Sequence, residues 1–274
     1  MPGSLRSPTP LPLVVRELAV RRVVDVTPGM RRVTLAGEQL GEFTGPDGRH
    51  HPAFSSEGFD DDIRLLFPYP GDERPVLPLI RNGRIRFARG RRPIARAYTV
   101  RRHCPRTGEL DVDVVLHGHG VASAWARDVT PGAPMHIVGP GRTESLPVGH
   151  DWVLAVGDDT ALPAIARLLE MLPRSARGLV FLTTLDAAHQ QELDTPPGVS
   201  VTWLHPEPGR TDPHDVIDAM RSSTWPDGTP FAWVAGEQSE VRSVRRHLVK
   251  ERSVPASAID FSGYWRRSAV ATDA

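Results

Sequence analysis

The sequence predicts a two-domain β + α/β protein, in which an antiparallel β-barrel is followed by an open parallel sheet. Two observations carry this prediction. Up to about residue 145 the chain reads as short strands separated by turns, and 24 glycines and 27 prolines supply many turn positions. Beyond that point continuous apolar strands alternate with amphipathic helices, which is the pattern of a parallel sheet with crossover helices.

The strands of the first half follow from period-2 patterning. In residues 110–116, Asp111 and Asp113 alternate with apolar residues, as in a half-buried strand. Further strands are expected over residues 18–26, 30–35, 62–67 and 97–102, with a turn over 27–30. Strands this short, joined by frequent turns, favour a small antiparallel barrel.

The second half begins after a linker predicted over residues 140–147, which divides the chain into domains 1–146 and 147–274. Buried strands are expected over 152–156, 179–183, 199–203 and 231–235, and helices over 160–172, 214–221 and 239–252. Asp159 or Thr160 is the expected cap of the first helix and Ser239 that of the last.

Composition excludes several classes of function. Lys plus Arg and Asp plus Glu both number 33, so bulk charge gives no reason to expect nucleic acid or a membrane surface as partner. No apolar run reaches the length of about 18 residues that a transmembrane helix needs. Lys250 is the single lysine, so an anion site here is an arginine site. Cys104 is the single cysteine, which excludes an internal disulfide.

Arg96-Ala-Tyr-Thr99, at the start of a strand, is the first of three candidate ligand-binding segments. The ring of Tyr98 can stack on a planar heterocycle, Thr99 can hydrogen-bond its edge, and Arg96 can meet a phosphate. The same residues also fit a barrel strand with one interfacial tyrosine. The pattern by itself leaves both interpretations open.

The second segment, His117-Gly-His-Gly-Val-Ala-Ser123, leaves a strand and enters a helix. Gly118 allows a ligand to approach the backbone, and the amides of Ala122 and Ser123 would face an anion at the helix N-terminus. A glycine-containing turn before a core helix is the alternative. His117 and His119 stand two residues apart, but no other ligand has matching spacing, so we expect no metal.

The third segment combines two turns, Gly157-Asp-Asp-Thr160 and Gly236-Glu237, which both follow apolar strands. Ligands of open α/β sheets bind beyond the carboxyl ends of the strands, at such turns. The G-x-G-x-x-G fingerprint of dinucleotide sites is absent, and ordinary strand-to-helix turns have the same composition. Neither turn alone identifies a nucleotide site.

Together these segments resemble the siderophore-interacting protein family of flavin-dependent ferric-siderophore reductases. The resemblance covers most of the chain. It is carried by the order and spacing of Asp62–Pro68, Arg96–Arg101, Leu116–Ala126, Gly139-Pro140, Gly157–Ala164 and Ser262–Arg266. It implies a flavin-binding barrel over 1–146 and an NAD(P)H-binding α/β domain over 147–274.

The resemblance also implies roles for individual residues. Those expected at the FAD are Arg96, Tyr98, Thr99, His117, Gly118, Ala122 and Ser123. Those expected at the nicotinamide nucleotide are Gly157, Asp158, Thr160, Gly236 and Glu237. Tyr264 and Trp265 are expected to reach the flavin or the substrate mouth, and Arg142 and Arg266 to attract an anionic ferric siderophore.

The activity implied by the resemblance is electron transfer from NADPH or NADH, through FAD, to siderophore-bound Fe(III), releasing Fe(II) for iron assimilation. A flavin is needed because hydride carries two electrons and Fe(III) accepts one. The reaction requires no acid or base, and the sequence shows no catalytic triad or carboxylate pair. We expect a monomeric cytoplasmic enzyme with no nucleic-acid partner and no membrane insertion.

Departures from the family pattern leave the choice of nicotinamide open. Gly157-Asp-Asp-Thr160 replaces the usual Gly-Asp-Glu-Thr, and residues 183–186 lack a valine- and glutamate-rich pattern. Two other functions also remain. One is a related flavin reductase with another acceptor, such as a ferredoxin or a quinone. The other is a non-enzymatic siderophore-binding module without flavin, against which the intact Arg96–Thr99 segment argues.

Overall fold

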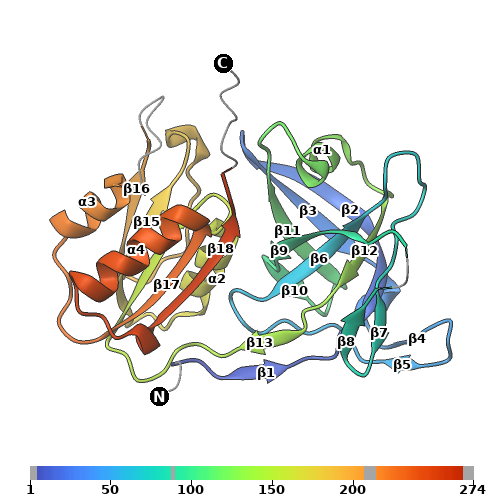
Figure 1. Ribbon diagram of the computed structural model, residues 1–274, viewed down its shortest axis with the longest axis horizontal. Helices are drawn as coiled ribbons and strands as arrows, with labels where there is room; N and C mark the ends of the chain where they lie inside the picture. The colour runs from blue at the N-terminus through green and yellow to red at the C-terminus, as the bar shows by residue number, and fades with distance from the viewer. Residues whose placement is uncertain (1–4, 88–89, 207–213, 268–274) are drawn as a thin grey trace. The chain divides into compact units, whose positions relative to one another are not determined.

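The computed structural model describes residues 5–87, 90–206 and 214–267, which fold into two compact units (Figure 1). The first unit is Ser7–Leu146. The second contains the described chain from Pro147 onward, together with Leu5 and Arg6. Arg6 is buried and its guanidinium lies 3.4 Å from the carboxylate of Asp260, which ties this N-terminal segment to the second unit.

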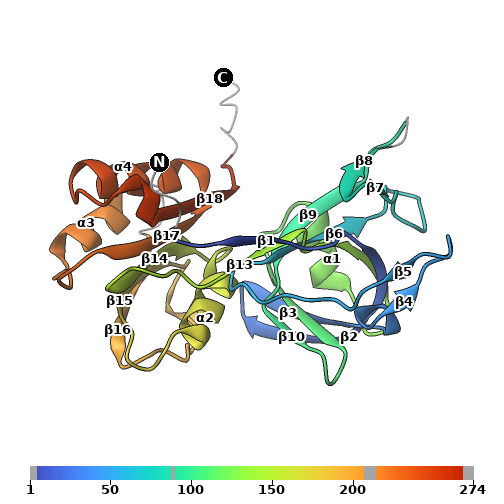
Figure 2. The ribbon, with the colours of Figure 1, turned by 90° about the horizontal axis from the view of Figure 1, so that it is seen from below.

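A seven-stranded antiparallel sheet in the order β10-β11-β3-β2-β12-β6-β9 forms the first unit and curls into a barrel (Figure 2). Its strands are β2 (Val15–Thr27), β3 (Met30–Ala36), β6 (Asp62–Phe67), β9 (Ile94–Thr99), β10 (Arg102–Cys104), β11 (Glu109–Val115) and β12 (Pro134–Val138). Helix α1 (Val121–Asp128) lies between β11 and β12 in the chain. Three short ribbons pair β1 (Pro8–Pro10) with β13 (Arg142–Glu144), β4 (Phe43–Thr44) with β5 (His50–His51), and β7 (Leu79–Arg81) with β8 (Arg84–Arg86).

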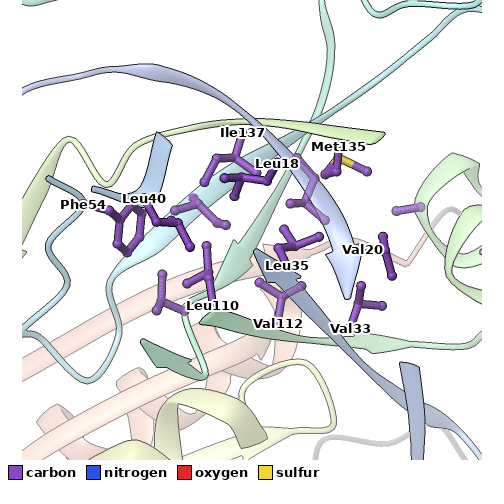
Figure 3. Close-up of a cluster of buried hydrophobic side chains, with 14 of the residues drawn as sticks. Leu18, Val20, Val33, Leu35, Leu40, Phe54, Leu110, Val112, Met135 and Ile137 are labelled. Carbon is purple, nitrogen blue, oxygen red and sulfur yellow. The ribbon is translucent and has the colours of Figure 1, made fainter. Parts of the chain in front are cut away.

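The barrel core follows from period-2 patterning. In β2, Leu18 and Val20 are buried, whereas the alternating residues Glu17 and Ala19 are exposed. Their side chains meet apolar side chains of the other strands in one cluster, shown in Figure 3. Fully burying a side chain of this kind stabilises the fold by about 1.5–3 kcal/mol. The core therefore fixes the strands that carry the exposed candidate residues.

The second unit is a five-stranded parallel sheet in the order β16-β15-β14-β17-β18. Its strands are β14 (Trp152–Asp158), β15 (Arg177–Thr183), β16 (Gly198–Leu204), β17 (Pro230–Glu237) and β18 (Ile259–Trp265). Helices α3 (His214–Ser222) and α4 (Gln238–Lys250) cover one face of the sheet, and α2 (Leu162–Met171) covers the other (Figure 2). Short 3-10 helices are Glu38–Leu40 in the first unit and Ala187–His189 and Ala256–Ala258 in the second.

Strands β14 and β17 read as continuous apolar runs because they are central in the sheet and covered on both faces. On one face Leu154 and Val156 join a cluster with Val241 and Leu248 of α4. On the other, α2 buries Ile165 among its apolar residues. The predicted fold class, an antiparallel barrel followed by an open parallel sheet, is confirmed.

Some boundaries differ from the prediction. The single strand expected over 97–102 is wrong, because β9 ends at Thr99 and β10 begins at Arg102. The amide of Val100 donates to the Asp61 carbonyl at 2.8 Å, whereas that of Arg101 donates to the Asp111 carbonyl at 2.9 Å. The chain thus changes partner strand at this point. The linker expected over 140–147 contains β13, and β18 was not predicted as a strand.

The residues predicted to cap α2 (Asp159 or Thr160) and α4 (Ser239) are also wrong. Helix α4 is capped by Glu237, whose carboxylate accepts from the amides of Ser239 and Glu240, and Ser239 is inside the helix. Helix α2 has Ala161 at its N-cap position, without a side-chain cap in the described chain. None of the helices in the described ranges is long and apolar enough to cross a membrane.

A buried carboxylate anchors the start of β6, and its removal gives a test of the barrel. Asp61 accepts hydrogen bonds from the Gly58 amide at 3.0 Å and the Thr143 hydroxyl at 2.9 Å. We expect Asp61→Ala to lower the free energy of unfolding by about 2 kcal/mol, since buried donors lose an acceptor. Urea titration of the full chain, followed by circular dichroism, measures this. Glu57→Ala, in the same loop but exposed, is the control, and equal midpoints for the two variants would refute the anchor.

Candidate functional site

Strand β9 carries the first candidate segment at the edge of the barrel sheet, where β6 is its neighbour. The register places Arg96 opposite Leu65 and Tyr98 opposite Ile63. Side chains of paired residues share a face, so Ile94, Arg96 and Tyr98 lie on the face of the buried Leu65 and Ile63. Arg96 itself is exposed at this edge.

Tyr98 and Thr99 differ in environment. Burial raises the pKa of Tyr98 to about 12, so its phenol keeps the proton and remains a hydrogen-bond donor at neutral pH. Thr99 is the next residue along the strand and points to the other face, where it is buried. The structure therefore brings Arg96 and Tyr98 to one face of β9, and the side chain of Thr99 lies on the opposite face.

Helix α1 begins at Val121, directly after the second candidate segment. Gly118 and Gly120 have φ of 79° and 82°, a region that favours glycine. No side chain in the described ranges caps the helix, and the amides of its first turn have no intrahelical acceptor. The buried Ser123 hydroxyl accepts from the His117 amide at 3.0 Å, so it closes the loop and leaves the helix amides to face an anion.

His117 and His119 form a ring pair. Their ring centroids lie 4.3 Å apart in an edge-to-face arrangement. Burial, followed by the neighbouring His119, lowers the pKa of His117 and favours its neutral form. Over the described ranges no group of three or more His, Cys, Asp or Glu side chains is placed to hold a metal ion.

A cavity of about 690 Å³ joins the first two segments, because Arg96 and Val121 both line it. The remaining lining residues come from the β6–β7 connection and the start of β9: Pro68, Tyr69, Pro70, Gly71, Asp72, Pro93 and Ile94. A guanidinium and an uncapped helix N-terminus suit an anion, and the apolar wall suits a flat ring. The cavity therefore suits a ligand that has both an anionic group and a flat ring.

The third candidate segment lies at the carboxyl edge of the parallel sheet, where Asp158 links three strands. Its carboxylate accepts from the Thr160 amide at 2.8 Å and the Glu237 amide at 3.0 Å. It also accepts from the indole of Trp265 at 2.7 Å, which ties β18 to β14. Both oxygens of Asp158 are thus engaged within the protein. Its role in the described structure is to fix the edge.

Glu237 performs a similar task at the end of β17. Its carboxylate accepts from the Ser239 amide at 2.6 Å, the Glu240 amide at 3.1 Å and the Arg267 amide at 3.1 Å. Burial acts to raise the pKa of Glu237, but these hydrogen bonds outweigh it and lower the pKa below its usual value. Glu237 therefore stays ionised as the cap of α4.

The two glycines of this edge allow close packing. A Cβ on Gly157 would meet the Ala161 Cβ at 2.5 Å. A Cβ on Gly236, whose φ is 138°, would meet the Asp158 carboxylate at 2.7 Å. Both positions therefore need glycine for the turns to reach the Asp158 cluster. The structure brings together the predicted Gly157, Asp158, Thr160, Gly236, Glu237 and Trp265.

Two further acids border this edge. Asp159 was expected only as a helix cap, and Glu240 was not singled out by any sequence pattern. Burial, followed by the neighbouring Asp158, raises the pKa of Asp159 to about 6. Burial, followed by Asp158 and Glu237, raises the pKa of Glu240 to about 7. Asp159 and Glu240 thus have pKa values raised towards neutrality, whereas Glu237 stays ionised. Only the spatial proximity of β14 and α4 brings Glu240 close to Asp158, since these two residues are far apart in the sequence.

The remaining predicted residues are exposed. Tyr264 contacts the Trp233 ring edge-to-face at 6.3 Å between centroids and is 37% exposed. Arg266 follows β18 and is exposed. Arg142 lies in β13 of the first unit, where its guanidinium is 3.4 Å from the Glu144 carboxylate. The two arginines expected to attract substrate therefore belong to different units.

Two family models match the chain, one in each half. The model described as siderophore-interacting FAD-binding domain matches residues 19–144. The model described as siderophore-interacting protein matches residues 150–268. The boundary between the two matched ranges coincides with the boundary between the two structural units, and together the matches cover most of the sequence.

Individual proteins resemble the chain over nearly its whole length. The NADPH-dependent ferric-chelate reductase of Escherichia coli K12 is 32% identical, over 91% of this chain and 92% of its own. The ferric vibriobactin reductase ViuB of Vibrio cholerae is 31% identical, over 88% of this chain and 86% of its own. The crystal structure of a siderophore utilization protein from T. fusca has a TM-score of 0.85 and 35% identity, covering 96% of this chain and 97% of its own.

The raised pKa of Glu240 gives a pH-dependent prediction. Its pKa in the folded protein is about 7 and its usual value is 4.5, so ionising it costs stability. That cost is absent below the usual pKa, grows as the pH rises, and is complete above the folded-state pKa. We expect Glu240→Gln to stabilise the protein at about pH 8, by up to about 3 kcal/mol, and to have little effect at about pH 4.5.

Thermal unfolding across this pH range measures the effect. Glu192→Gln removes an exposed carboxyl of the same unit and is the control, for which we expect no pH-dependent gain. A Tm difference between Glu240→Gln and the unmodified chain that does not change with pH would show that Glu240 ionises normally.

Proposed function

The chain belongs to the siderophore-interacting protein family, and from that premise we propose how its residues serve its reaction. The protein is an FAD-dependent reductase that passes electrons from NADPH to siderophore-bound Fe(III). The observation that supports the residue assignment best is the cavity of about 690 Å³ in the barrel unit, at which Arg96 and the N-terminus of α1 meet.

The barrel residues fit the chemical structure of FAD. Its diphosphate needs positive charge, which Arg96 and the uncapped amides of Ala122 and Ser123 supply. Its isoalloxazine needs a flat neighbour and a donor at the ring edge, which the protonated phenol of Tyr98 provides with Thr99 beside it. His117 and Gly118 shape the loop that presents the helix N-terminus.

The carboxyl edge of the parallel sheet is the proposed NADPH site, as expected for an open α/β sheet. Asp158 and Glu237 hold this edge rigid, because their oxygens accept from backbone amides of three segments. Gly157 and Gly236 let the turns pack closely against Ala161 and Asp158. Tyr264 and Trp265 lie next to the edge on β18, with Trp265 oriented by its bond to Asp158.

Bound FAD supplies the conversion between the two electrons of NADPH and the single electron that Fe(III) accepts. The protein's own part is to bind and orient, so no side chain needs to exchange a proton with substrate. The side chains of Asp158, Glu237 and Trp265 are engaged in internal hydrogen bonds, which agrees with a positioning role. Arg142 and Arg266 are exposed, and we propose that their charge attracts anionic ferric siderophores.

We further propose that the protein works as a monomer in the cytoplasm, the compartment in which NADPH is generated. Its zero formal net charge gives no reason to expect a nucleic-acid partner. Light scattering after size-exclusion chromatography tests the monomer, and a mass near twice 30.1 kDa would overturn it.

The visible spectrum of the purified protein tests the proposed function most directly. After incubation with FAD and removal of the excess, we expect bound flavin bands that bleach with NADPH under anaerobic conditions. The bands should return when a ferric siderophore is added and not when the iron-free siderophore is added. A protein that retains no flavin would contradict the assignment. So would a reduced protein whose flavin bands stay bleached after the ferric siderophore is added.

A charge reversal at Arg266 tests the proposed attraction of substrate. We expect Arg266→Glu to raise the KM for an anionic ferric siderophore about three- to tenfold at low salt, with unchanged affinity for FAD. The effect should shrink as salt screens the charges. Lys250→Glu, at the far end of α4 about 18 Å from its start, is the matched control. Equal KM changes for anionic and neutral chelates would argue against this role.

A further inference from the structure

Tyr69 lines the same cavity as Arg96, in the connection between β6 and β7, yet neither the sequence patterns nor the roles above use it. The cavity wall on this side is apolar and formed by Tyr69, Pro93 and Ile94. Pro93 and Ile94 precede Arg96 in the chain, whereas Tyr98 follows it. The cavity therefore extends past Arg96 in the direction away from Tyr98.

A tight turn holds the backbone of Tyr69. Residues Tyr69–Asp72 form a type II turn, with Pro70 in its second position and Gly71, at φ of 86°, in its third. The Asp72 amide closes the turn by donating to the Tyr69 carbonyl at 2.9 Å. Proline and glycine fit these positions without strain, so the turn is formed before any ligand arrives.

The aromatic ring is held as firmly as the backbone. The Tyr69 hydroxyl donates to the Arg92 carbonyl at 2.8 Å. The guanidinium carbon of Arg91 lies 3.8 Å from the ring centroid, in cation–π contact, and Arg91 pairs with Asp72 at 3.0 Å. Arg91 is not among the described residues that line the cavity, so it backs the ring and leaves the other side of the ring to the cavity.

The order of groups along β9 indicates what this ring faces. Tyr98, Arg96 and Ile94 alternate along one face and span about 13 Å at about 3.3 Å per residue. In the proposed function Tyr98 borders the isoalloxazine and Arg96 the diphosphate. A ligand laid along this row then presents its remaining part, the adenosine, at Ile94 and Tyr69.

We propose that Tyr69, backed by Arg91, is the platform on which the adenine of FAD stacks, and that this contact makes the protein select FAD over FMN. The inference rests on the proposed function, since it needs the flavin in the barrel unit. FMN has the isoalloxazine and one phosphate but no adenosine, so it ends at Arg96. A preorganised aromatic ring binds a base without losing side-chain freedom, which strengthens the contact.

The test compares FAD and FMN binding to the full chain stripped of flavin, measured by quenching of flavin fluorescence. We expect Tyr69→Ala to raise the Kd for FAD about tenfold or more and to change the Kd for FMN less than about twofold. Tyr69→Phe keeps the ring and should stay near the unmodified affinity for both flavins. Phe87→Ala removes an exposed aromatic ring of the neighbouring ribbon and is the matched control.

Arg96→Ala gives a contrasting pattern, because both flavins carry a phosphate. We expect it to weaken FAD and FMN alike. An unchanged FAD affinity in Tyr69→Ala, or equal losses for FAD and FMN in a folded variant, would overturn the platform. If thermal unfolding shows that Tyr69→Ala is not folded, Arg91→Ala takes its place, with a loss confined to FAD expected and equal affinities overturning the inference.

The failure of this inference is distinguishable from failure of the proposed function. If the unmodified chain binds both flavins but Tyr69→Ala has no effect, the reductase assignment stands and the platform is wrong. If the unmodified chain binds neither flavin, the flavin assignment fails and the platform falls with it.

Discussion

The candidate flavin site depends on the pairing register between β6 and β9. Arg96 and Tyr98 share one face of β9 because they lie opposite Leu65 and Ile63, which are buried. A shift of one residue would turn Arg96 and Tyr98 to the other face and put Ala95 and Ala97 in their place. The register is fixed by apolar burial and by Asp61, whose carbonyl accepts from the amide that follows β9. Residues outside the candidate site thus determine which side chains that site presents.

The second unit uses carboxylates for a comparable purpose. Asp158 and Glu237 stand where a nucleotide site is expected, yet their oxygens accept hydrogen bonds from within the protein. Close to them, Asp159 and Glu240 have raised pKa values of about 6 and about 7 because burial and like charge oppose ionisation. At neutral pH this edge therefore carries less negative charge than four carboxyl groups with ordinary pKa values would give it.

Local patterning predicted elements whose character depends on their own residues. The strand over Asp62–Phe67 has its predicted bounds, and the apolar runs of the parallel sheet are strands as expected. The pattern failed where a distant partner decides the outcome. Strand β18 is tied by Trp265 to Asp158, 107 residues away in the sequence, and α4 is capped by Glu237 rather than Ser239. Tyr69 was missed because its significance depends on Arg91, which sequence spacing does not connect to it.

A site that only positions its reactants explains why each motif looked ambiguous by itself. The Ser123 hydroxyl closes its own loop, and Gly236 makes room for a carboxylate, so both have structural roles. The groups that the proposed function assigns to the cofactors are backbone amides, an arginine and aromatic ring faces, which occur in many ordinary proteins. Their specificity arises from being held in one order along β9 and one sheet edge. Substitutions at such supporting residues should therefore change cofactor affinity before they change the chemistry that the bound cofactor performs.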